Sequence, residues 1–562
     1  MSKLITLTFS NNNIEATPYV GKPSQSIRIV QQADGSSGIR SFYTDLALNL
    51  SETGVWASPY EGSAYQSFWI IQQPDGSSII RNAYSGSALT MTEFGVRSSS
   101  YVEGNRNQRF NLVPQADGST GLRKVSRSLF NGTVDAFEAI KRVGNWFFSS
   151  VQQPTGFYHP KNSVLTCELL LTGTIEGSQP TLIIGAAYTD PDTTYALPRI
   201  YPLTVGLNTI RDEGGGMVYL LLGGEENIAN LTFTSGVVEA PCFEHKKNTL
   251  KNYRDMLTTW DSSPFVELIS ERAVVTVSRA AALTYQSSDQ NILMDTYEQI
   301  ISIEDNLLGL DGSTALHKRA PLKHHLILGN YGGPGYAHAA HGYTAYHENF
   351  GRELLTPNGL KGSWGVAHEL GHQNQMLAYL APDFIEVTNN IHSLAVERAF
   401  GLPSTLTGQG ADGRDIWDST LAKLGSPNLS IADLGIYERL AALEQLRLAF
   451  GDQFWRDLNR TTREQWSSNG FWPSREKAFD NLGLFASIAA KADLRDFFSA
   501  WGIPLSNQCK EDIGRLGLPL PSVKPQTLRE PRSTQPSTIA PPELIHCTDH
   551  PHPPGCNTDS TH

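Results

Sequence analysis

The sequence predicts a multidomain α+β protein, with β-rich structure in its first half and mainly helical structure beyond it. Three observations support this fold class. The chain has 562 residues, more than one domain usually holds. Its first 140 residues repeat a hairpin pattern, and from about residue 246 apolar residues recur at three- and four-residue spacing. Hydrophobic residues make up 40% and charged residues 18% of the chain, as is usual for globular proteins.

The first 140 residues contain an internal repeat. The segments that begin at Gln25, Gln66 and Gln108 are alike and lie 41 and 42 residues apart. Each segment has an alternating strand, an Asp-Gly pair and a second short strand, a pattern typical of β-hairpins. The Asp-Gly pairs are Asp34-Gly35, Asp75-Gly76 and Asp117-Gly118. Units of this size cannot each bury a core, so we expect the three to pack together.

The repeat resembles that of ricin-B-type β-trefoils, whose units carry the motif Q-x-W. Here the third position is Ile27, Phe68 or Phe110, so the Trp is missing from each copy. The resemblance implies a β-trefoil over residues 1–140 that binds glycans through an Asp and an aromatic residue near each motif. Because Q-x-W is mainly a core element in that family, a trefoil that binds nothing is the alternative.

Residues 141–245 are expected to form a second β domain. Val164–Leu171, Thr181–Ala187 and Met217–Leu222 are strand-like runs bounded by Gly, Pro and Asp. Nothing in this part indicates chemistry.

Residues 246–522 are expected to be mainly helical. Ser278–Leu307 and Ile431–Phe450 have the apolar periodicity of helices. Residues 523–562 are rich in Pro, Ser and Thr, which predicts a disordered or extended tail.

The helical part contains an HExxH motif, formed by His368, Glu369 and His372. Residues four apart lie on one face of a helix, so the two imidazoles are placed to bind one zinc ion, with the glutamate beside it. Gly371 leaves room for close packing next to the metal. A surface helix that carries two histidines by chance is the alternative, but the apolar neighbours predict a buried helix, where unpaired His and Glu would be costly.

Zinc needs a third protein ligand and an open position for water. Glu386, fourteen residues after His372, is the candidate. Pro382 and Asp383 just before it predict the start of a second helix, with Asp383 as its N-cap, so that Glu386 faces the first helix. Glu397 remains an alternative, because it lies on the same helical face as Glu386.

The segments GxxHELGHxxQ and EVTNNIxS resemble those of M60/enhancin-like metallopeptidases, whose motif is HExxH followed after a variable spacer by Glu. The matching residues are Gly365, His368, Glu369, Gly371, His372, Gln375, Glu386, Asn389, Asn390 and Ser393. The resemblance covers roughly residues 145–520. It implies a β-sandwich over residues 141–245 and a gluzincin-like zinc peptidase domain over residues 246–522.

The residues around the zinc site are expected to hydrolyse a peptide bond. Glu369, which is not needed as a ligand, would take a proton from the attacking water and pass it to the leaving amine. Tyr343, in a segment HGY that resembles the family's AGY, is a candidate oxyanion donor. Asn390 and Gln375 are expected to hold the zinc ligands from a second layer. Asn389 and Asn390 are also candidate contacts to the substrate.

The segment Leu322–Tyr346 is expected to form a strand and a Gly-rich loop beside the cleft. In zinc peptidases with this motif, an edge strand next to the zinc helix pairs with extended substrate. In the family that the motifs resemble, part of the glycan is bound next to the zinc, which makes Gly332 and Gly333 of this loop candidate substrate contacts. The segment also contains His338, His341 and His347. A second metal site is the alternative use of these histidines, but no tight ligand spacing supports it.

The family resemblance implies action on mucin-type, O-glycosylated proteins. A lectin-like trefoil on the same chain would hold the catalytic domain on such a substrate and raise its effective concentration. The sequence thus predicts a zinc endopeptidase that cleaves O-glycosylated proteins and binds glycans through its trefoil. Two alternatives remain: a lectin-like or toxin-like glycan-binding protein with an inactive peptidase domain, and a zinc endopeptidase that is indifferent to glycans.

Charge and composition limit the other partners. The net charge is −12 and no basic patch stands out, which argues against nucleic acid and anionic membranes. No apolar run is long enough to span a membrane. The N-terminus lacks the features of a signal peptide, yet the implied substrate predicts a protein that is secreted or otherwise delivered outside the cell, and we expect a monomer. The five cysteines form no CxxC pair, so neither a disulfide framework nor a cysteine zinc site is expected.

Overall fold

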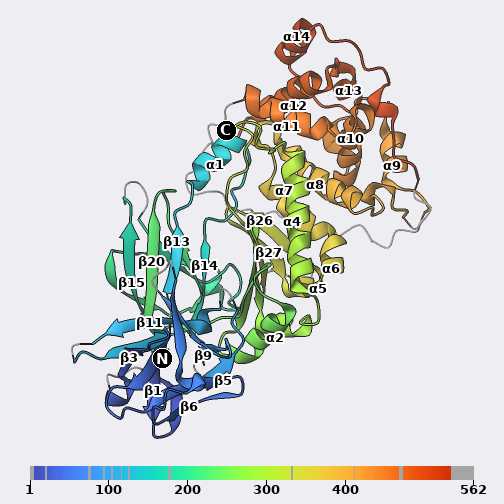
Figure 1. The fold of residues 1–562 in the computed structure, drawn as a ribbon. Helices are drawn as coiled ribbons and strands as arrows, with labels where there is room; N and C mark the ends of the chain where they lie inside the picture. The colour runs from blue at the N-terminus through green and yellow to red at the C-terminus, as the bar shows by residue number, and fades with distance from the viewer. Residues whose placement is uncertain are drawn as a thin grey trace.

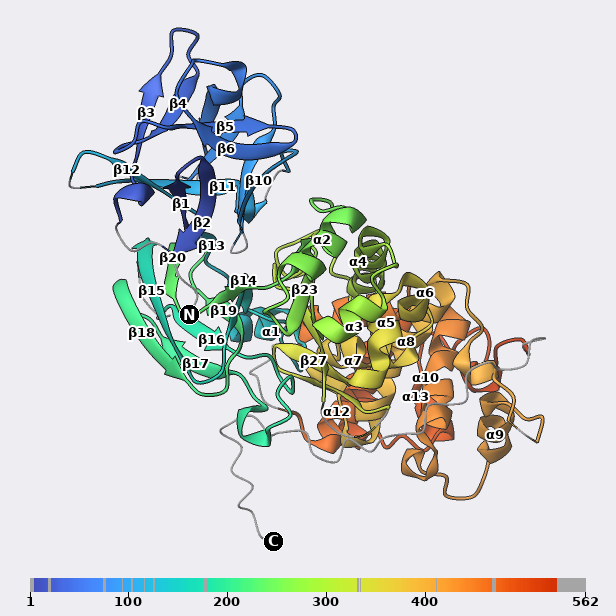
Figure 2. The same cartoon turned by 90° about the horizontal axis from the view of Figure 1, so that it is seen from below.

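The computed structural model describes residues 5–18, 22–73, 77–92, 95–102, 105–115, 117–124, 127–174, 179–330, 333, 335–410, 412–466 and 472–532. Figures 1 and 2 show three parts in chain order: a group of strands (blue), a second group of strands (cyan to green), and a larger part in which helices cover a sheet (green to red). The prediction of a multidomain α+β protein is confirmed. Within the described ranges, no helix is both long and apolar enough to cross a membrane.

The first part consists of short antiparallel strands around a single core. The strands are β1 (Ile5–Ser10), β2 (Asn13–Pro18), β3 (Ile27–Gln31), β4 (Ser37–Ser41), β5 (Ala47–Ser51), β6 (Gly54–Ser58), β7 (Phe68–Gln72), β8 (Ser78–Asn82), β9 (Ala88–Thr92), β10 (Gly95–Ser99), β11 (Arg109–Pro114) and β12 (Thr120–Lys124). The three repeats form the pairs β3–β4, β7–β8 and β11–β12. Ile27, Phe68 and Phe110 are fully buried in the shared core, so the repeats pack together as expected.

Two of the three predicted Asp-Gly turns lie in the described ranges. In the first, the Asp34 carboxylate accepts hydrogen bonds from the backbone N (2.9 Å) and Oγ (2.6 Å) of Ser36. Gly35 has φ 83°, a left-handed conformation that favours glycine. The turn at Asp117-Gly118 repeats these contacts. The turn at Asp75-Gly76 lies outside the described residues.

The second part is built from two sheets and one short helix. Its elements are β13 (Arg127–Asn131), α1 (Ala136–Val143), β14 (Gln153–His159), β15 (Ser163–Thr172), β16 (Thr181–Ile184), β17 (Arg199–Pro202), β18 (Gly206–Asp212), β19 (Gly216–Leu221), β20 (Ile228–Ser235) and β21 (Val238–Glu239). The sheets have the orders β13-β20-β15-β18 and β17-β16-β19-β14-β21, and they enclose one apolar core between them. Strand β13 pairs with β20, so this part begins before residue 141, the predicted boundary.

The third part begins with a mixed sheet. Its strands are β22 (Cys242–Glu244), β23 (Phe265–Ile269), β24 (Ala273–Ser278), β25 (His324–Gly329), β26 (Ala337–Ala340) and β27 (Tyr343–His347). Their order is β22-β23-β24-β25-β27-β26, so β26 lies at an edge of the sheet. The segment Leu322–Tyr346 therefore contains two short strands beyond the single strand that we predicted.

Helices pack on this sheet and continue beyond it. They are α2 (Leu250–Thr259), α3 (Arg279–Thr284), α4 (Gln290–Leu307), α5 (Gly351–Leu355), α6 (Pro357–Lys361), α7 (Trp364–Gln373), α8 (Ile385–Ala399), α9 (Ile416–Lys423), α10 (Ile436–Phe450), α11 (Phe454–Gln465), α12 (Arg475–Ala490), α13 (Arg495–Ala500) and α14 (Asn507–Arg515). Helices α4 and α7 share a core with the sheet. The later helices surround a second core, and α8 contributes to both.

Three helix predictions differ from the structure. The range Ile431–Phe450 holds a 3-10 turn (Ile431–Asp433) and then α10, which begins only at Ile436. The range Ser278–Leu307 holds two helices, because Asp289 accepts hydrogen bonds from the first turn of α4 and so starts a new helix after α3. Asp383 does not cap α8. Its carboxylate pairs with Arg475 at 2.6 Å, and Phe384 occupies the N-cap position.

The first ten residues of the predicted disordered or extended tail, 523–532, contact the helical part. Gln445 Nε2 donates to the backbone oxygens of Gln526 (3.1 Å) and Leu528 (2.7 Å). Arg529 pairs with Asp418 at 2.7 Å. These polar contacts attach the segment to α9 and α10 although its composition is that of a linker. Residues 533–562 lie outside the described residues.

Candidate metal centre

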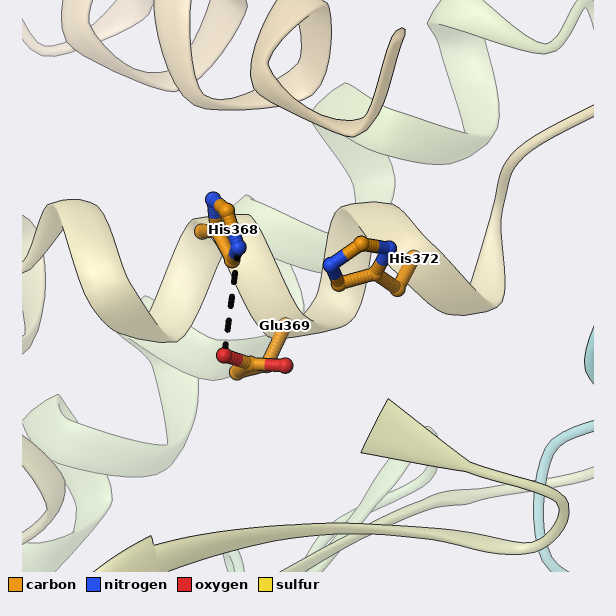
Figure 3. Close-up of side chains that lie close together, drawn as sticks. All are labelled: His368, Glu369 and His372. Atoms are coloured by element: carbon orange, nitrogen blue, oxygen red, sulfur yellow. Dashed lines mark ion pairs between the residues drawn. The ribbon is translucent and has the colours of Figure 1, made fainter. Parts of the chain in front are cut away.

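Helix α7 carries the three residues of the HExxH motif. Ser363 caps its first turn by accepting a hydrogen bond from the backbone N of Val366 (3.2 Å). His368 and His372 lie one turn apart, with ring centroids 4.8 Å from each other. Potential ligand atoms of these two residues and Glu369 all lie within 4.8 Å of one another. Figure 3 shows the three side chains on the same stretch of helix, with a dashed line for the ion pair between Glu369 and His368.

Glu386 is the carboxylate that meets both imidazoles. Its Oε2 lies 3.2 Å from His368 Nε2 and 3.3 Å from His372 Nε2. Glu386 is in the first turn of α8, where its backbone departs from helical geometry (φ −90°, ψ 19°). Glu397 is used differently, because its carboxylate accepts hydrogen bonds from N (2.9 Å) and Oγ1 (2.6 Å) of Thr405.

Two amide side chains orient the histidines. Asn390 Oδ1 lies 2.7 Å from His368 Nδ1, and Gln375 Oε1 lies 2.9 Å from His372 Nδ1. The amide nitrogens point the other way: Asn390 Nδ2 donates to the backbone oxygen of Glu386 (2.9 Å) and Gln375 Nε2 to that of residue 385 (2.6 Å). Since an amide oxygen only accepts, each Nδ1 carries a hydrogen, and each Nε2 lies towards Glu386.

Asn389 lies deeper than a substrate contact would suggest. It is fully buried, and its Nδ2 is 3.1 Å from His368 Nε2 and 2.9 Å from His372 Nε2. Its Oδ1 accepts a hydrogen bond from the backbone N of Asn390 (2.9 Å), which sets the orientation of the amide. Asn389 therefore lies directly at the point where the two Nε2 atoms converge.

The site is buried and acidic. Glu369 is 4% exposed, with Oε1 4.0 Å from His368 Nε2. Burial alone would lower the pKa of His368, but the hydrogen bond with Glu386 and the charges of Glu369 and Glu386 outweigh it and raise that pKa to about 9. A metal ion at this site would therefore compete with a proton for His368.

The donor set fits a zinc ion. Two neutral imidazole nitrogens and one carboxylate oxygen are ligands that zinc accepts, and a three-residue set leaves a position open for water. The orienting amides supply the second layer that such ligands need. The ligand residues are brought together because α7 and α8 cross closely. A Cβ at Gly371 would lie 2.4 Å from the backbone oxygen of Asn389, so only glycine permits the two helices to approach this closely.

The edge strand predicted beside the zinc helix is β26, which neighbours α7. Gln373 of α7 donates to the backbone oxygens of Ala340 (3.2 Å) and Tyr343 (3.0 Å), which connects the helix to β26 and β27. Tyr343 is half-buried, 5.6 Å from His338 and 6.4 Å from Tyr188 by ring centroids.

The remaining predicted positions are placed as follows. Gly333 is exposed and has open space around it, whereas Gly332 lies outside the described residues. His341 lies among aromatic rings, 4.6 Å from Phe148 by centroids. In the described part of the chain, the only cluster of three or more potential ligand side chains is that of α7, so His338, His341 and His347 do not form a second one.

The sequence analysis missed an aromatic group beside the metal centre. Trp146, from the segment after α1, lies 6.4 Å from His372 by ring centroids and stacks on Phe147 at 4.0 Å. Trp472, just before α12, lies 4.9 Å from Trp146 and is 39% exposed. The run Trp146–Phe148 was the one local signal. Its position beside a histidine more than two hundred residues away follows only from the fold.

A helix with paired histidines, crossed by a second helix that adds a glutamate and bordered by an edge strand, defines a metallopeptidase-like protein. Residues 236–502 match the model of the family peptidase M60, enhancin and enhancin-like. The match includes the HExxH motif and Glu386, in line with the resemblance that the motifs indicated.

Curated relatives cover part of the chain. The TRPM8 channel-associated factor homolog of Xenopus laevis is 25% identical over 301 residues, which make up 52% of this chain and 31% of the relative. Human TRPM8 channel-associated factor 2 is 22% identical over 311 residues, or 54% of this chain and 32% of the relative. The chain thus spans about a third of the length of these relatives.

Solved structures share the fold. A functionally unknown conserved protein from Bacillus anthracis str. Ames has a TM-score of 0.62 at 25% identity, over 71% of this chain and 80% of that one. ZmpB metallopeptidase from Clostridium perfringens has a TM-score of 0.60 at 21% identity, over 71% and 83%. The M60 catalytic domain of ZmpC from the same organism, in complex with the sialyl T antigen, has a TM-score of 0.59 at 18% identity, over 71% and 81%. The last two structures have low sequence identity to this chain, so their similarity shows a shared fold only.

Proposed function

We propose that this protein is a zinc-dependent endopeptidase that hydrolyses peptide bonds in O-glycosylated, mucin-type proteins outside the cell, acting as a monomer. One observation carries the proposal: Oε2 of Glu386 lies within 3.3 Å of the Nε2 atoms of both His368 and His372, and both imidazoles are oriented by amide side chains. These three residues would hold the metal, and Glu369 beside them is not needed as a ligand.

A bound zinc ion would supply Lewis acidity, lowering the pKa of water to about 7 and polarising the scissile carbonyl. The chain itself supplies the proton transfer. Glu369 takes a proton from the attacking water on a carboxylate oxygen and passes it to the nitrogen of the leaving amine as the C–N bond breaks. Burial of Glu369 shields this transfer from bulk water. Tyr343 remains the candidate donor to the developing oxyanion.

The substrate is proposed to lie along β26. This strand is at the edge of its sheet, the place where an extended peptide can add as a further strand. Such pairing recognises any peptide backbone, and selectivity for a class of substrates needs further contacts from side chains. Gly333 and Asn390 are the described candidates for these contacts.

The aromatic pair beside His372 supports a glycosylated substrate. The rings of Trp146 and Trp472 come from distant segments of the chain and lie next to each other. The exposed face of Trp472 is suited to stacking on a sugar ring. A structural relative, the ZmpC catalytic domain, was solved in complex with the sialyl T antigen. Both observations favour a glycan next to the cleaved bond.

We also propose that the first part is a β-trefoil that binds glycans. Its three repeated hairpins share one core, and each repeat opens with a buried glutamine. Tyr43 and Tyr84 follow the second strand of the first and second repeats at matching positions, and they are 55% and 80% exposed. Exposed aromatic rings at equivalent places in two repeats are suitable platforms for sugars.

The test is mass spectrometry of a mucin-type O-glycoprotein after incubation with the zinc-loaded protein. Cleavage beside glycosylated Ser or Thr is expected with the native chain. It should be absent with the Glu369→Gln variant, which keeps the size of the side chain but cannot accept the proton. It should also be absent when the O-glycans have been removed from the substrate. Cleavage that persists without glycans would favour the glycan-indifferent endopeptidase.

A binding protein without peptidase activity is the second candidate. The curated relatives are named as channel-associated factors, which describes an association and not a reaction. If the native chain and Glu369→Gln both bind the glycoprotein and neither cleaves it after zinc loading, this candidate replaces the peptidase.

A further inference from the structure

The segment that follows α1 in the second part pairs with the chain just after the metal helix α7. The backbone N of Trp146 donates to the backbone oxygen of Gln375 (2.9 Å). Asn145 forms an antiparallel bridge with Met376, and its side-chain Nδ2 donates to the backbone oxygen of Gln373, the last residue of α7 (3.2 Å). A stretch of the second part is therefore bonded to the chain that leaves the metal helix.

Gln375 connects this pairing to a candidate metal ligand. Its side-chain Oε1 lies 2.9 Å from Nδ1 of His372, and its Nε2 donates to Oγ1 of Thr388 in α8 (2.7 Å). The residue lies beyond the end of α7, and its backbone N is 3.5 Å from the oxygen of His372, a long hydrogen bond. The shorter bond from Trp146 therefore fixes its backbone. We infer that residues 144–146 are a positioning segment of the metal centre, which holds His372 in place through Gln375.

The positioning segment is anchored on both sides, so it can act as a fixed support. Before it, Nε of Arg463 in α11 donates to the backbone oxygen of Val143 (2.9 Å). After it, the backbone oxygen of Phe148 accepts a hydrogen bond from the N of Gly342, in the turn between β26 and β27 (2.9 Å). The ring of Phe148 also lies 4.6 Å from that of His341 by centroids. The segment is thus held by both α11 and the hairpin that contains the edge strand.

Gly144 allows the positioning segment to approach the chain after α7 this closely. Its φ of 82° is a left-handed conformation that favours glycine. Its backbone oxygen accepts a hydrogen bond from the N of Leu377 (2.8 Å). A Cβ at this position would lie 3.0 Å from Cε of Met376. A larger residue would strain the turn and press on the chain next to Gln375.

The positioning segment lies outside residues 236–502, the range that matches the family model. The candidate ligands all belong to the third part, yet the orientation of one of them depends on backbone bonds from the second part. The second part therefore supports the metal centre directly. The inference rests on the proposed function in one respect, since it takes His368, His372 and Glu386 as the metal ligands.

The test uses the full chain loaded with cobalt(II), whose visible absorption depends on the geometry of its ligands. Asn145→Ala removes the donor to Gln373, and Gly144→Ala forces the segment away from Met376. Each variant should weaken cobalt(II) affinity about tenfold, the low end of the usual effect of disturbing a partner of a metal ligand, and should shift the absorption bands. A merely structural role would lower stability and leave the bands unchanged.

Gly206→Ala is the matched control. Gly206 lies at the start of β18 in the second part, has a positive φ of 96°, and has open space around an added Cβ. Its replacement should cost stability as Gly144→Ala does, but should leave the affinity and the bands as in the native chain. Thermal unfolding followed by circular dichroism shows that each variant is folded and compares their stabilities.

The inference is overturned if Asn145→Ala and Gly144→Ala are folded and keep the native affinity and bands, or if Gly206→Ala changes both as much. If Gly144→Ala does not fold, Asn145→Ala decides alone. Cleavage of the O-glycoprotein tests the proposed function separately. A native chain that cleaves nothing, but whose cobalt(II) site changes in the two variants, retains the positioning segment and loses the peptidase. A native chain that binds no cobalt(II) overturns both.

Discussion

At the scale of single residues, the candidate metal centre depends on amide side chains that orient its histidines. Asn390 and Gln375 each accept a hydrogen bond from the Nδ1 of one histidine, which turns the Nε2 of each ring towards Glu386. Without these acceptors the rings could rotate or carry the hydrogen on the other nitrogen, and both changes oppose metal binding.

We therefore expect Asn390→Ala to weaken zinc affinity by about 10- to 100-fold, the usual effect of removing such a partner. Asn390→Asp retains an oxygen acceptor for His368 Nδ1 and should keep most of the affinity. Competition with a zinc chelator measures both variants. Equal affinity in the alanine variant and the native chain would show that Asn390 does not orient His368.

At the scale of elements, the crossing of α7 and α8 places the glutamate against the histidines. The crossing depends on Gly371, where a Cβ would lie 2.4 Å from the backbone oxygen of Asn389 and 3.2 Å from the Cβ of His392. The first of these atoms belongs to the backbone, so the helices would have to separate.

Gly371→Ala should cost about 1–3 kcal/mol of unfolding free energy, as other overpacked substitutions do, and should weaken zinc binding as the ligands move apart. The matched control is Gly362→Ala, where the added Cβ would lie at an ordinary 3.5 Å from the nearest atom, the backbone oxygen of Asn358. Unfolding midpoints and zinc titrations of both variants test the prediction, which fails if the two behave alike.

Strand β25 makes the third part sensitive to acid. Burial, aided for His324 by the charge of Arg319, lowers the pKa of His324 to about 4, and burial lowers that of His325 to about 3. With folded-state pKa values below the ordinary 6.5, the unfolded chain binds these protons more tightly than the folded protein. The stabilisation is therefore complete above about pH 6.5 and is lost as the pH falls towards 4.

Each histidine should contribute a loss of about 2 kcal/mol between pH 6.5 and pH 5. His325→Gln removes one of these groups, while an amide still reaches the hydroxyl of Thr276 that His325 Nε2 contacts at 2.8 Å. Denaturant midpoints at pH 7 and pH 5 should differ less in this variant than in the native chain. An unchanged difference would mean that His325 does not govern the acid response.

At the scale of the whole molecule, Arg463 of α11 connects distant segments. Its Nε donates to the backbone oxygen of Val143 (2.9 Å), one Nη to that of Leu308 (2.9 Å), and the other Nη lies 3.0 Å from His317 Nδ1. The side chain is almost fully buried. Through Val143 it supports the segment that brings Trp146 to the metal centre.

Arg463→Met should cost about 3 kcal/mol, because several buried acceptors lose a charged donor. Arg460→Met on the same helix removes a more exposed ion pair with Asp311 and should cost less than about 1 kcal/mol. Calorimetric unfolding compares the two. If both variants unfold at the same temperature, Arg463 does not hold these segments together.

The sequence predicted the local features of the site and of the hairpins, because these features depend on residues only a few positions apart. The HExxH motif needs one helical turn, the Asp-Gly turns need neighbouring residues, and Asn390 follows Glu386 by one turn of α8. The sequence left Glu397 as an alternative ligand, and only the fold shows that its carboxylate is bound to Thr405. A second helix can present several acidic residues in one direction, so spacing alone does not select among them.

The sequence by itself determined the order of the three parts, the repeated hairpins and the two histidines on one helical face, because periodicity and turn chemistry act over a few residues. Tertiary structure decided which carboxylate meets those histidines, which aromatic rings border them, and that β26 lies at the sheet edge. It also attached residues 523–532 to α9 and α10. These features depend on contacts between segments that are far apart in the chain, and no local pattern encodes such contacts.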